Sequence, residues 1–118
     1  MARSPSPETH LRLLSGSDAV VLALDGSRVV GFVTATTDGV LGARIPLPEV
    51  LPGHQGRGTG GELVRRMLAA LRDLYTVDLV CDPELVPFYA SPGMRPASGM
   101  VVRRYTKQPG KNAGGAIY

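Results

Sequence analysis

A cluster of glycines near the middle of the chain constrains the fold more than any other feature. Five glycines lie between Gly53 and Gly61, directly before a segment with helical spacing of apolar residues. A glycine-rich turn that opens a helix presents free N–H groups at the positive end of the helix dipole. The cluster therefore predicts a turn that binds an anion such as a phosphate group. A turn that needs only positive φ angles and holds no ligand is the alternative.

Two Asp-Gly pairs predict an antiparallel meander before this cluster. Asp-Gly between apolar runs is a strong hairpin signal, and it occurs at Asp25-Gly26 and Asp38-Gly39. The expected strands cover residues 19–24, 28–35 and 40–51. In the third strand, Pro46 and Pro48 lack N–H groups on the same edge, and proline is normally excluded from central strands. We expect one edge of that strand to be incompletely paired.

The rest of the chain predicts helices and two further strands. After the glycine cluster, apolar residues share one helical face: Leu63, Val64, Met67, Leu68, Leu71 and Leu74. The other expected elements are a helix over 9–15, a strand over 77–81, a short helix over 83–89 and a last strand over 100–105. Residues 1–8 and 107–118 are expected to be a flexible leader and tail, which leaves one domain over residues 9–106.

Composition narrows the class of ligand. The 118 residues carry a formal charge of +3, which favours a small anionic ligand and does not by itself indicate nucleic acid. Aromatic residues make up 5% of the chain, too few for a base-stacking surface. The charged run Arg103, Arg104, Lys107 and Lys111 could contact nucleic acid, but a solvated tail is the favoured interpretation.

Simple features of the sequence predict where the protein is located and how its single cysteine behaves. No apolar run approaches the roughly 20 residues that cross a bilayer, and the N-terminus does not have the pattern of a secretory signal. We therefore expect a cytoplasmic protein with no membrane partner. The single cysteine, Cys81, excludes an internal disulfide and is expected to be an inert buried thiol. Asp78 and Asp82 lack partners for a metal site, so no metal is assigned.

Two known phosphate-binding motifs compete for the glycine cluster. A P-loop is excluded because no Gly-Lys-Ser/Thr follows. The dinucleotide motif G-x-G-x-x-G does fit Gly56, Gly58 and Gly61, and Asp82 follows the next strand, where a ribose-binding acid belongs. Against it, Pro52-Gly53-His54 separates strand from turn, and the preceding strands form a meander instead of a βαβ unit. NAD(P) binding stays the weaker alternative.

Two motifs in this order resemble the GNAT superfamily of acetyl-CoA-dependent N-acyltransferases. Gln55-Gly56-Arg57-Gly58-Thr59-Gly60 is similar to the family's Q/R-x-x-G-x-G/A pyrophosphate loop, and Val50-Leu51-Pro52 matches the end of the preceding strand. The segment from Pro87 to Met94 resembles the family's FYxxxGF segment. The likeness covers roughly residues 19–105. It implies an α/β (α+β) fold, with a mixed, mostly antiparallel central sheet flanked by helices and a splayed strand before the pyrophosphate loop.

The resemblance also implies a reaction, in which an amine attacks the thioester of acetyl-CoA directly within a ternary complex. The pyrophosphate would bind to Gln55, Gly56, Arg57, Gly58, Thr59 and Gly60, and the pantetheine arm would pair with the backbone of Val50 and Leu51. Tyr89 of the FY pair would contact the cosubstrate and protonate the departing thiolate. Glu49 is the candidate base, with a structural or substrate-charge role as the alternative.

Departures from the family pattern shape the remaining expectations. Asp82 stands where many members carry Asn, and His54 is expected to be a solvated loop residue. We expect the family's first strand and much of its following helical region to be absent or reduced to residues 9–15. We therefore expect either an open acceptor cleft, for a small-molecule or a peptide or protein amine, or a cleft completed by a second subunit of a homodimer. A CoA-binding regulatory or interaction module with little catalysis is the alternative function.

Overall fold

The first Asp-Gly pair forms the hairpin that starts the sheet. The structure, a computed structural model, describes residues 7–107. Strand β1 (Ala19–Asp25) pairs antiparallel with β2 (Arg28–Thr37), and Asp25 faces Arg28 across the turn. Gly26 has a φ of 63°, the left-handed conformation that such a hairpin turn requires. The predicted first hairpin is confirmed.

The predicted third strand exists as two short pieces. Strands β3 (Gly42–Arg44) and β4 (Glu49–Val50) both pair antiparallel with β2, and the register shifts by one residue between the two ladders. Pro46 and Pro48 lie between the pieces, outside either strand. One extra residue between two ladders acts as a β-bulge, which bends the strand. The prolines therefore mark the place where the third strand bends.

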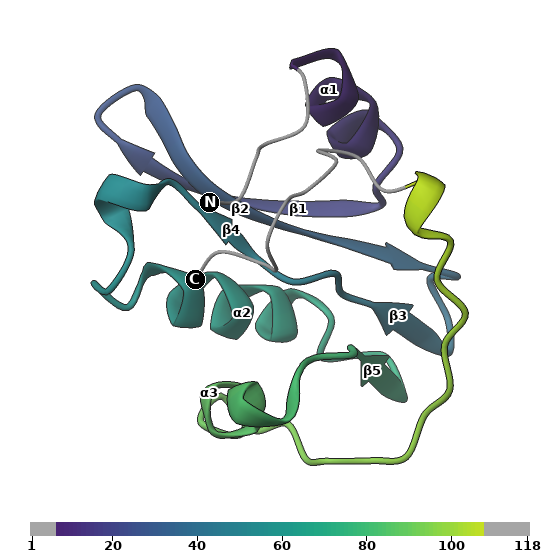
Figure 1. Cartoon of the computed structure of the whole chain (residues 1–118). Helices are drawn as coiled ribbons and strands as arrows, with labels where there is room; N and C mark the ends of the chain where they lie inside the picture. The colour runs from purple at the N-terminus through teal and green to yellow at the C-terminus, as the bar shows by residue number, and fades with distance from the viewer. Residues whose placement is uncertain (1–6, 108–118) are drawn as a thin grey trace.

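The sheet splits after β5 (Thr76–Asp78), which pairs in parallel with β3. The strand order is β1-β2-β3-β5, and β4 pairs only with β2. The Ile45 N–H donates to the Asp78 carbonyl at 2.9 Å, just beyond the last residues of the β3–β5 ladder. Past this point the segment that follows β3 and the segment that follows β5 diverge, so β4 has one open edge in the described part of the chain (Figure 1). This is the expected splayed strand.

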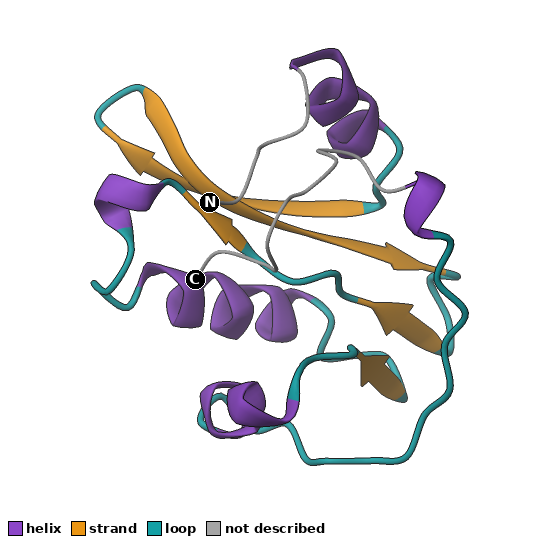
Figure 2. Ribbon diagram, in the orientation of Figure 1, coloured by secondary structure: helices purple, strands orange, loops and turns teal. Residues whose placement is uncertain are grey.

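Helix α2 (Thr59–Ala70) covers one face of the sheet (Figure 2). Its apolar residues recur at helical spacing, and Val64 and Met67 are fully buried. The core cluster consists of Val33, Ala35, Ala43, Ile45, Val50, Leu63, Met67 and Leu71. The predicted helical face is therefore the face that builds the core, and the mixed, mostly antiparallel sheet flanked by helices is confirmed.

The opposite face of the sheet carries α1 (Pro7–Ser15), which begins two residues before its expected start (Figure 1). On this face of β1, Val20, Leu22 and Leu24 are 38%, 47% and 59% exposed. The two faces thus differ, because α2 buries its side of the sheet, whereas these three side chains of β1 stay partly open to solvent. No helix there is both long enough and apolar enough to span a membrane.

The C-terminal part departs from the sequence prediction. Helix α3 (Val86–Ala90) follows the 3-10 turn Pro83–Leu85, and β5 ends before the predicted residues 79–81. The predicted last strand over residues 100–105 is wrong: residues 95–104 have no regular structure, and Tyr105–Lys107 is a 3-10 turn.

Residues 100–105 form no strand because they have no neighbouring strand to pair with in the described part of the chain. A strand needs a neighbouring strand to pair its N–H and C=O groups, and none lies beside this segment within residues 7–107 (Figure 2). Met100 and Val102 are accordingly 99% and 78% exposed. The expected leader and tail fall mainly on residues 1–6 and 108–118, which lie outside the described residues.

Candidate functional site

The glycine cluster connects β4 to α2 and contains two residues in the left-handed conformation. Gly56 and Gly58 have φ angles of 75° and 81°, and Gly58 is the N-cap of α2. Residues with a Cβ are strained at such angles. An added Cβ at either position would nevertheless meet no atom within 4 Å. Glycine is therefore required here by the backbone conformation, and the space beside the turn stays open for a ligand.

The start of α2 offers backbone donors to that open space. The Glu62 N–H donates to the Gly58 carbonyl at 3.0 Å, which makes Gly58 the acceptor that starts the helical ladder. The N–H groups of Thr59, Gly60 and Gly61 precede this bond and have no earlier helical carbonyl to reach. Together with the helix dipole, they form a site that favours an anion.

Strand β4 presents backbone groups to its open edge. The Leu51 N–H donates to the Val30 carbonyl at 2.8 Å, so this facing pair is hydrogen-bonded. Hydrogen-bonded and non-hydrogen-bonded pairs alternate along an antiparallel ladder. Val50, which faces Gly31, therefore directs its N–H and C=O away from β2 and toward the open edge. Of the two residues expected to pair with a pantetheine arm, Val50 has the outward geometry, whereas the Leu51 N–H is already used inside the sheet.

The Gln55 side chain turns back onto the protein. Its Nε2 donates to the outward Val50 carbonyl at 3.0 Å, and its own N–H lies 3.4 Å from the Pro52 carbonyl. The amide side chain is thus used to close the end of β4. A contact of Gln55 with a ligand would have to come from other atoms of the residue.

His54 is not the solvated loop residue expected from the sequence. It ends the 3-10 turn Pro52–His54, and its side chain is only 19% exposed. Its Nε2 lies 3.1 Å from Oδ2 of Asp25, in the β1–β2 hairpin. The prediction is wrong because the hairpin and the turn lie side by side in the fold and together cover the ring. The two residues are 29 positions apart, and nothing in the sequence signals their contact.

Arginines surround the one carboxylate in the first turn of α2. Glu62 accepts hydrogen bonds from Arg65 and from Arg66, the latter at 2.8 Å. The Arg66 hydrogen bond, aided by the charge of Arg65, holds the pKa of Glu62 below its ordinary value. This carboxylate therefore stays ionised, but its charge is neutralised locally, and Arg57 in the turn itself is exposed.

The two predicted catalytic residues belong to different sides of the sheet. Tyr89 lies in α3, is 3% exposed, and its ring meets that of Phe88 edge-on with centroids 4.9 Å apart. The Phe88 ring in turn lies 3.9 Å from where a Cβ on Gly61 would stand, so α3 packs beside the start of α2. Because Val50 packs into the core under α2, the half-buried Glu49 points to the opposite face.

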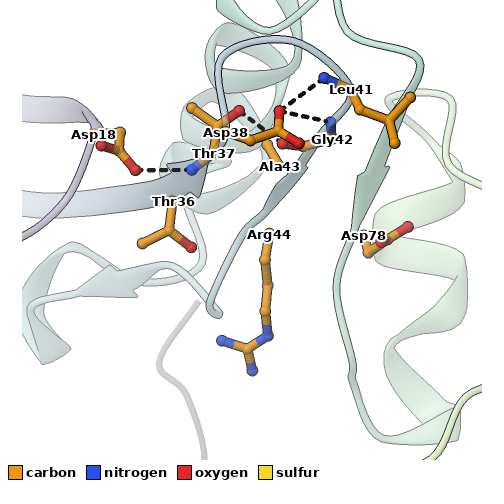
Figure 3. A pocket seen from close by; sticks show the side chains of 9 residues that line it. All are labelled: Asp18, Thr36, Thr37, Asp38, Leu41, Gly42, Ala43, Arg44 and Asp78. Atoms are coloured by element: carbon orange, nitrogen blue, oxygen red, sulfur yellow. Dashed lines mark hydrogen bonds between the residues drawn. The ribbon is translucent and has the colours of Figure 1, made fainter.

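A separate, open hollow of about 530 Å³ lies beside the C-terminal end of β2 (Figure 3). It is lined by Asp18, Thr36, Thr37, Asp38, Leu41, Gly42, Ala43, Arg44 and Asp78. Asp38 Oδ1 accepts from the N–H groups of Val40, Leu41 and Gly42 at 2.8, 2.7 and 3.2 Å. This carboxylate therefore holds the β2–β3 turn. The hollow contains none of the predicted site residues, so its size does not make it the functional site.

Comparison with known proteins identifies the family of this chain. The family model described as the acetyltransferase (GNAT) family matches residues 2–94, well over half of the chain. The chain belongs to the GNAT acetyltransferase family. This family uses acetyl-CoA, which matches an anion-binding turn beside an open strand edge. Within residues 7–107 of this GNAT chain, no group of three or more His, Cys, Asp or Glu could hold a metal ion.

Solved structures share the GNAT-like fold. A candidate acetyltransferase from Deinococcus radiodurans R1 superimposes with a TM-score of 0.84 at 47% identity, covering 94% of this chain and 78% of that one. A GNAT-family acetyltransferase from Streptococcus pneumoniae TIGR4 superimposes with a TM-score of 0.71 at 30% identity, covering 86% of this chain and 82% of its own.

Sequence relatives match a shorter stretch. The histone acetyltransferase TAP1 of Glycine max is 35% identical over 68 residues, which is 56% of this chain and 29% of that protein. An uncharacterized ycf52-like N-acetyltransferase of Prochlorococcus marinus is 38% identical over 68 residues, or 56% and 38% of the two chains. The matched region thus spans well under half of either relative.

We expect Gly58→Ala to lower the free energy of unfolding by about 1–2 kcal/mol, because a Cβ is strained in the left-handed conformation. Gly53→Ala is the matched control, since it lies in the same glycine cluster, has open space for a Cβ and has no positive φ. That control should be neutral or slightly stabilising. Urea denaturation of both variants measures the difference, and equal effects would contradict the conformational argument.

The Asp38 carboxylate predicts a pH-dependent contribution to stability. The hydrogen bonds from the backbone of Val40, Leu41 and Gly42 hold its pKa below the ordinary value of 3.8. A lowered folded-state pKa stabilises the fold above the unfolded value, and this stabilisation is lost as the pH falls through the folded pKa. Asp38→Asn should therefore melt below the wild type at neutral pH and converge with it in strong acid. Parallel melting curves at every pH would show that the charge of Asp38 does not contribute.

Proposed function

We propose that this GNAT-family chain is an N-acetyltransferase that moves an acetyl group from acetyl-CoA to a primary amine by direct attack. The observation that carries the proposal is the junction of β4 and α2. There, an open strand edge with the outward backbone of Val50 leads directly into a turn whose left-handed glycines, Gly56 and Gly58, open a helix. An open edge suits a ligand arm with amide groups, and a helix N-terminus suits a phosphate.

Different residues of this junction would bind different parts of acetyl-CoA. Gly56, Gly58, Thr59 and Gly60 would hold the pyrophosphate through backbone N–H groups, and the exposed Arg57 would add a charge-assisted contact. Val50 would pair with the pantetheine arm, because its N–H faces the open edge. Leu51 and Gln55 support this pairing from within the protein, the former through its bond to Val30 and the latter through its bond to the Val50 carbonyl.

The chemical step needs a proton acceptor and a proton donor. The thioester supplies the acetyl group; a C–N bond forms to the amine as the C–S bond breaks. Glu49 would accept the proton that the amine loses, through a water molecule because it lies on the sheet face opposite α2. Tyr89, in α3 beside the start of α2, would give its hydroxyl proton to the departing sulfur.

The acceptor is proposed as a class only. The Glycine max relative is named a histone acetyltransferase, whereas the names of the ycf52 relatives give no acceptor. We propose a primary amine on a small molecule, a peptide or a protein. A cytoplasmic location and a homodimer remain predictions.

Ligand protection tests the donor site. Acetyl-CoA and CoA should each raise the melting temperature of the wild type, and 100 times the dissociation constant corresponds to about 2.7 kcal/mol. Gly58→Glu should abolish the shift, because it strains the turn and places a negative charge beside the phosphates. Gly53→Glu, which adds the same charge to the same cluster without a positive φ, should keep more of it. Protection by NADP alone would favour the dinucleotide alternative, and no protection would overturn the proposal.

The role of Tyr89 separates an enzyme from a CoA-binding module. Tyr89→Phe keeps the aromatic ring and should therefore still bind CoA, but it should release free CoA about 100-fold more slowly with amines, since general acids contribute roughly 10²–10⁴. A thiol assay over a panel of primary amines measures this rate. Tight binding of CoA with no amine-dependent release by the wild type would favour the regulatory or interaction module.

A further inference from the structure

The contact between Asp25 and His54 joins the rigid part of the sheet to the entrance of the glycine turn. Asp25 ends β1 at the hairpin with β2, a ladder that pairs seven residues of β1 along its length. His54 stands directly before the Gln55–Gly60 motif. Their side chains meet at 3.1 Å between Nε2 and Oδ2. The hairpin therefore fixes the chain at the residue that precedes the anion-binding turn.

The position of the His54 ring is unfavourable in one respect. Its Nδ1 is buried and has no hydrogen-bond partner among the described residues. A buried polar atom without a partner costs free energy. The contact through Nε2 is therefore the polar interaction that the position of the ring provides.

The glycine turn that follows this contact loses much conformational entropy when it becomes ordered. Glycine restricts the unfolded or mobile backbone less than any other residue, and the turn holds Gly56, Gly58, Gly60 and Gly61 within six positions of Gln55. Ordering such a segment upon binding reduces affinity, and a segment that is ordered beforehand binds more tightly. Gln55 already holds the start of the turn through Val50, and His54, the residue directly before it, holds the same end through Asp25.

We propose that Asp25 and His54 form a clamp that holds the glycine turn in its phosphate-binding shape. Both are positioning residues, because they act on the ligand through the turn and not by contact. The inference rests on the proposed function, since it assumes that the turn binds the pyrophosphate of CoA.

The clamp and a simple effect of charge predict opposite changes in CoA affinity when the Asp25 carboxylate is removed, which makes the clamp testable. CoA is an anion, so removal of the Asp25 carboxylate should strengthen its binding if Asp25 acts only through its charge. The clamp predicts weaker binding instead. Asp73→Ala is the matched control, because Asp73 is an exposed carboxylate just beyond the C-terminal end of α2, the end opposite the glycine turn.

The experiment measures CoA affinity by calorimetry at fixed ionic strength. Asp25→Ala and His54→Leu should each weaken binding about fivefold, and the double variant should be no weaker than either single one. His54→Gln should restore most of the affinity, because its amide nitrogen can donate from nearly the place of Nε2. Amide hydrogen exchange over residues 55–61 should rise in the weakened variants without CoA, while exchange in β2 stays unchanged.

Each outcome decides the proposal. Binding by Asp25→Ala as tight as by Asp73→Ala, or unchanged binding by His54→Leu, would overturn the clamp while leaving the CoA site intact. Independent, additive losses in the double variant would also overturn it. If Asp25→Ala unfolds, Asp25→Asn replaces it, with a smaller loss expected. A wild type that binds no CoA would overturn the proposed function and this inference with it.

Discussion

The divergence of β4 from β5 is the constraint on which the site depends. The segment that contains β3 and β4 lies beside β5 as far as the hydrogen bond from the Ile45 N–H to the Asp78 carbonyl, and beyond it the two segments separate. A strand edge normally satisfies its N–H and C=O groups by pairing with a neighbour. Here the outward groups of Val50 lie on an edge that no strand within residues 7–107 covers, and its carbonyl already accepts a hydrogen bond from Gln55. The opening exists because the third strand bends between β3 and β4, at the segment that contains Pro46 and Pro48.

The glycine turn and the opening form one functional unit because they share β4. The strand leads into the 3-10 turn Pro52–His54, then into two left-handed glycines, and then into a helix whose buried face is anchored by Met67 and its neighbours. A ligand that combines a phosphate with an amide-bearing arm fits both parts, whereas a free phosphate would use only the turn. The proposed acetyl-CoA site would thus combine anion binding with strand-edge pairing.

Much of this was predictable from local patterns. The Asp25-Gly26 hairpin, the helix after the glycines and the incompletely paired edge signalled by two prolines all depend on residues that are close together in the sequence. The strand over residues 100–105 was wrongly predicted because strand propensity describes a surface that fits a sheet, and it cannot say whether a neighbouring strand is present. Its side chains are mostly exposed, since no such neighbour lies in the described part of the chain.

Local patterns were enough to predict the first hairpin, the helix after the glycines and the position of the glycine turn, because these follow from turn-forming residues and from periodicity. The tertiary structure decided which groups of those elements meet. It showed that Leu51 is bound inside the sheet while Val50 faces outward, that Glu49 and Tyr89 lie on different sides of the sheet, and that His54 reaches Asp25. Pairing register and contacts between distant segments are properties of the packed chain, so no local pattern could have specified them.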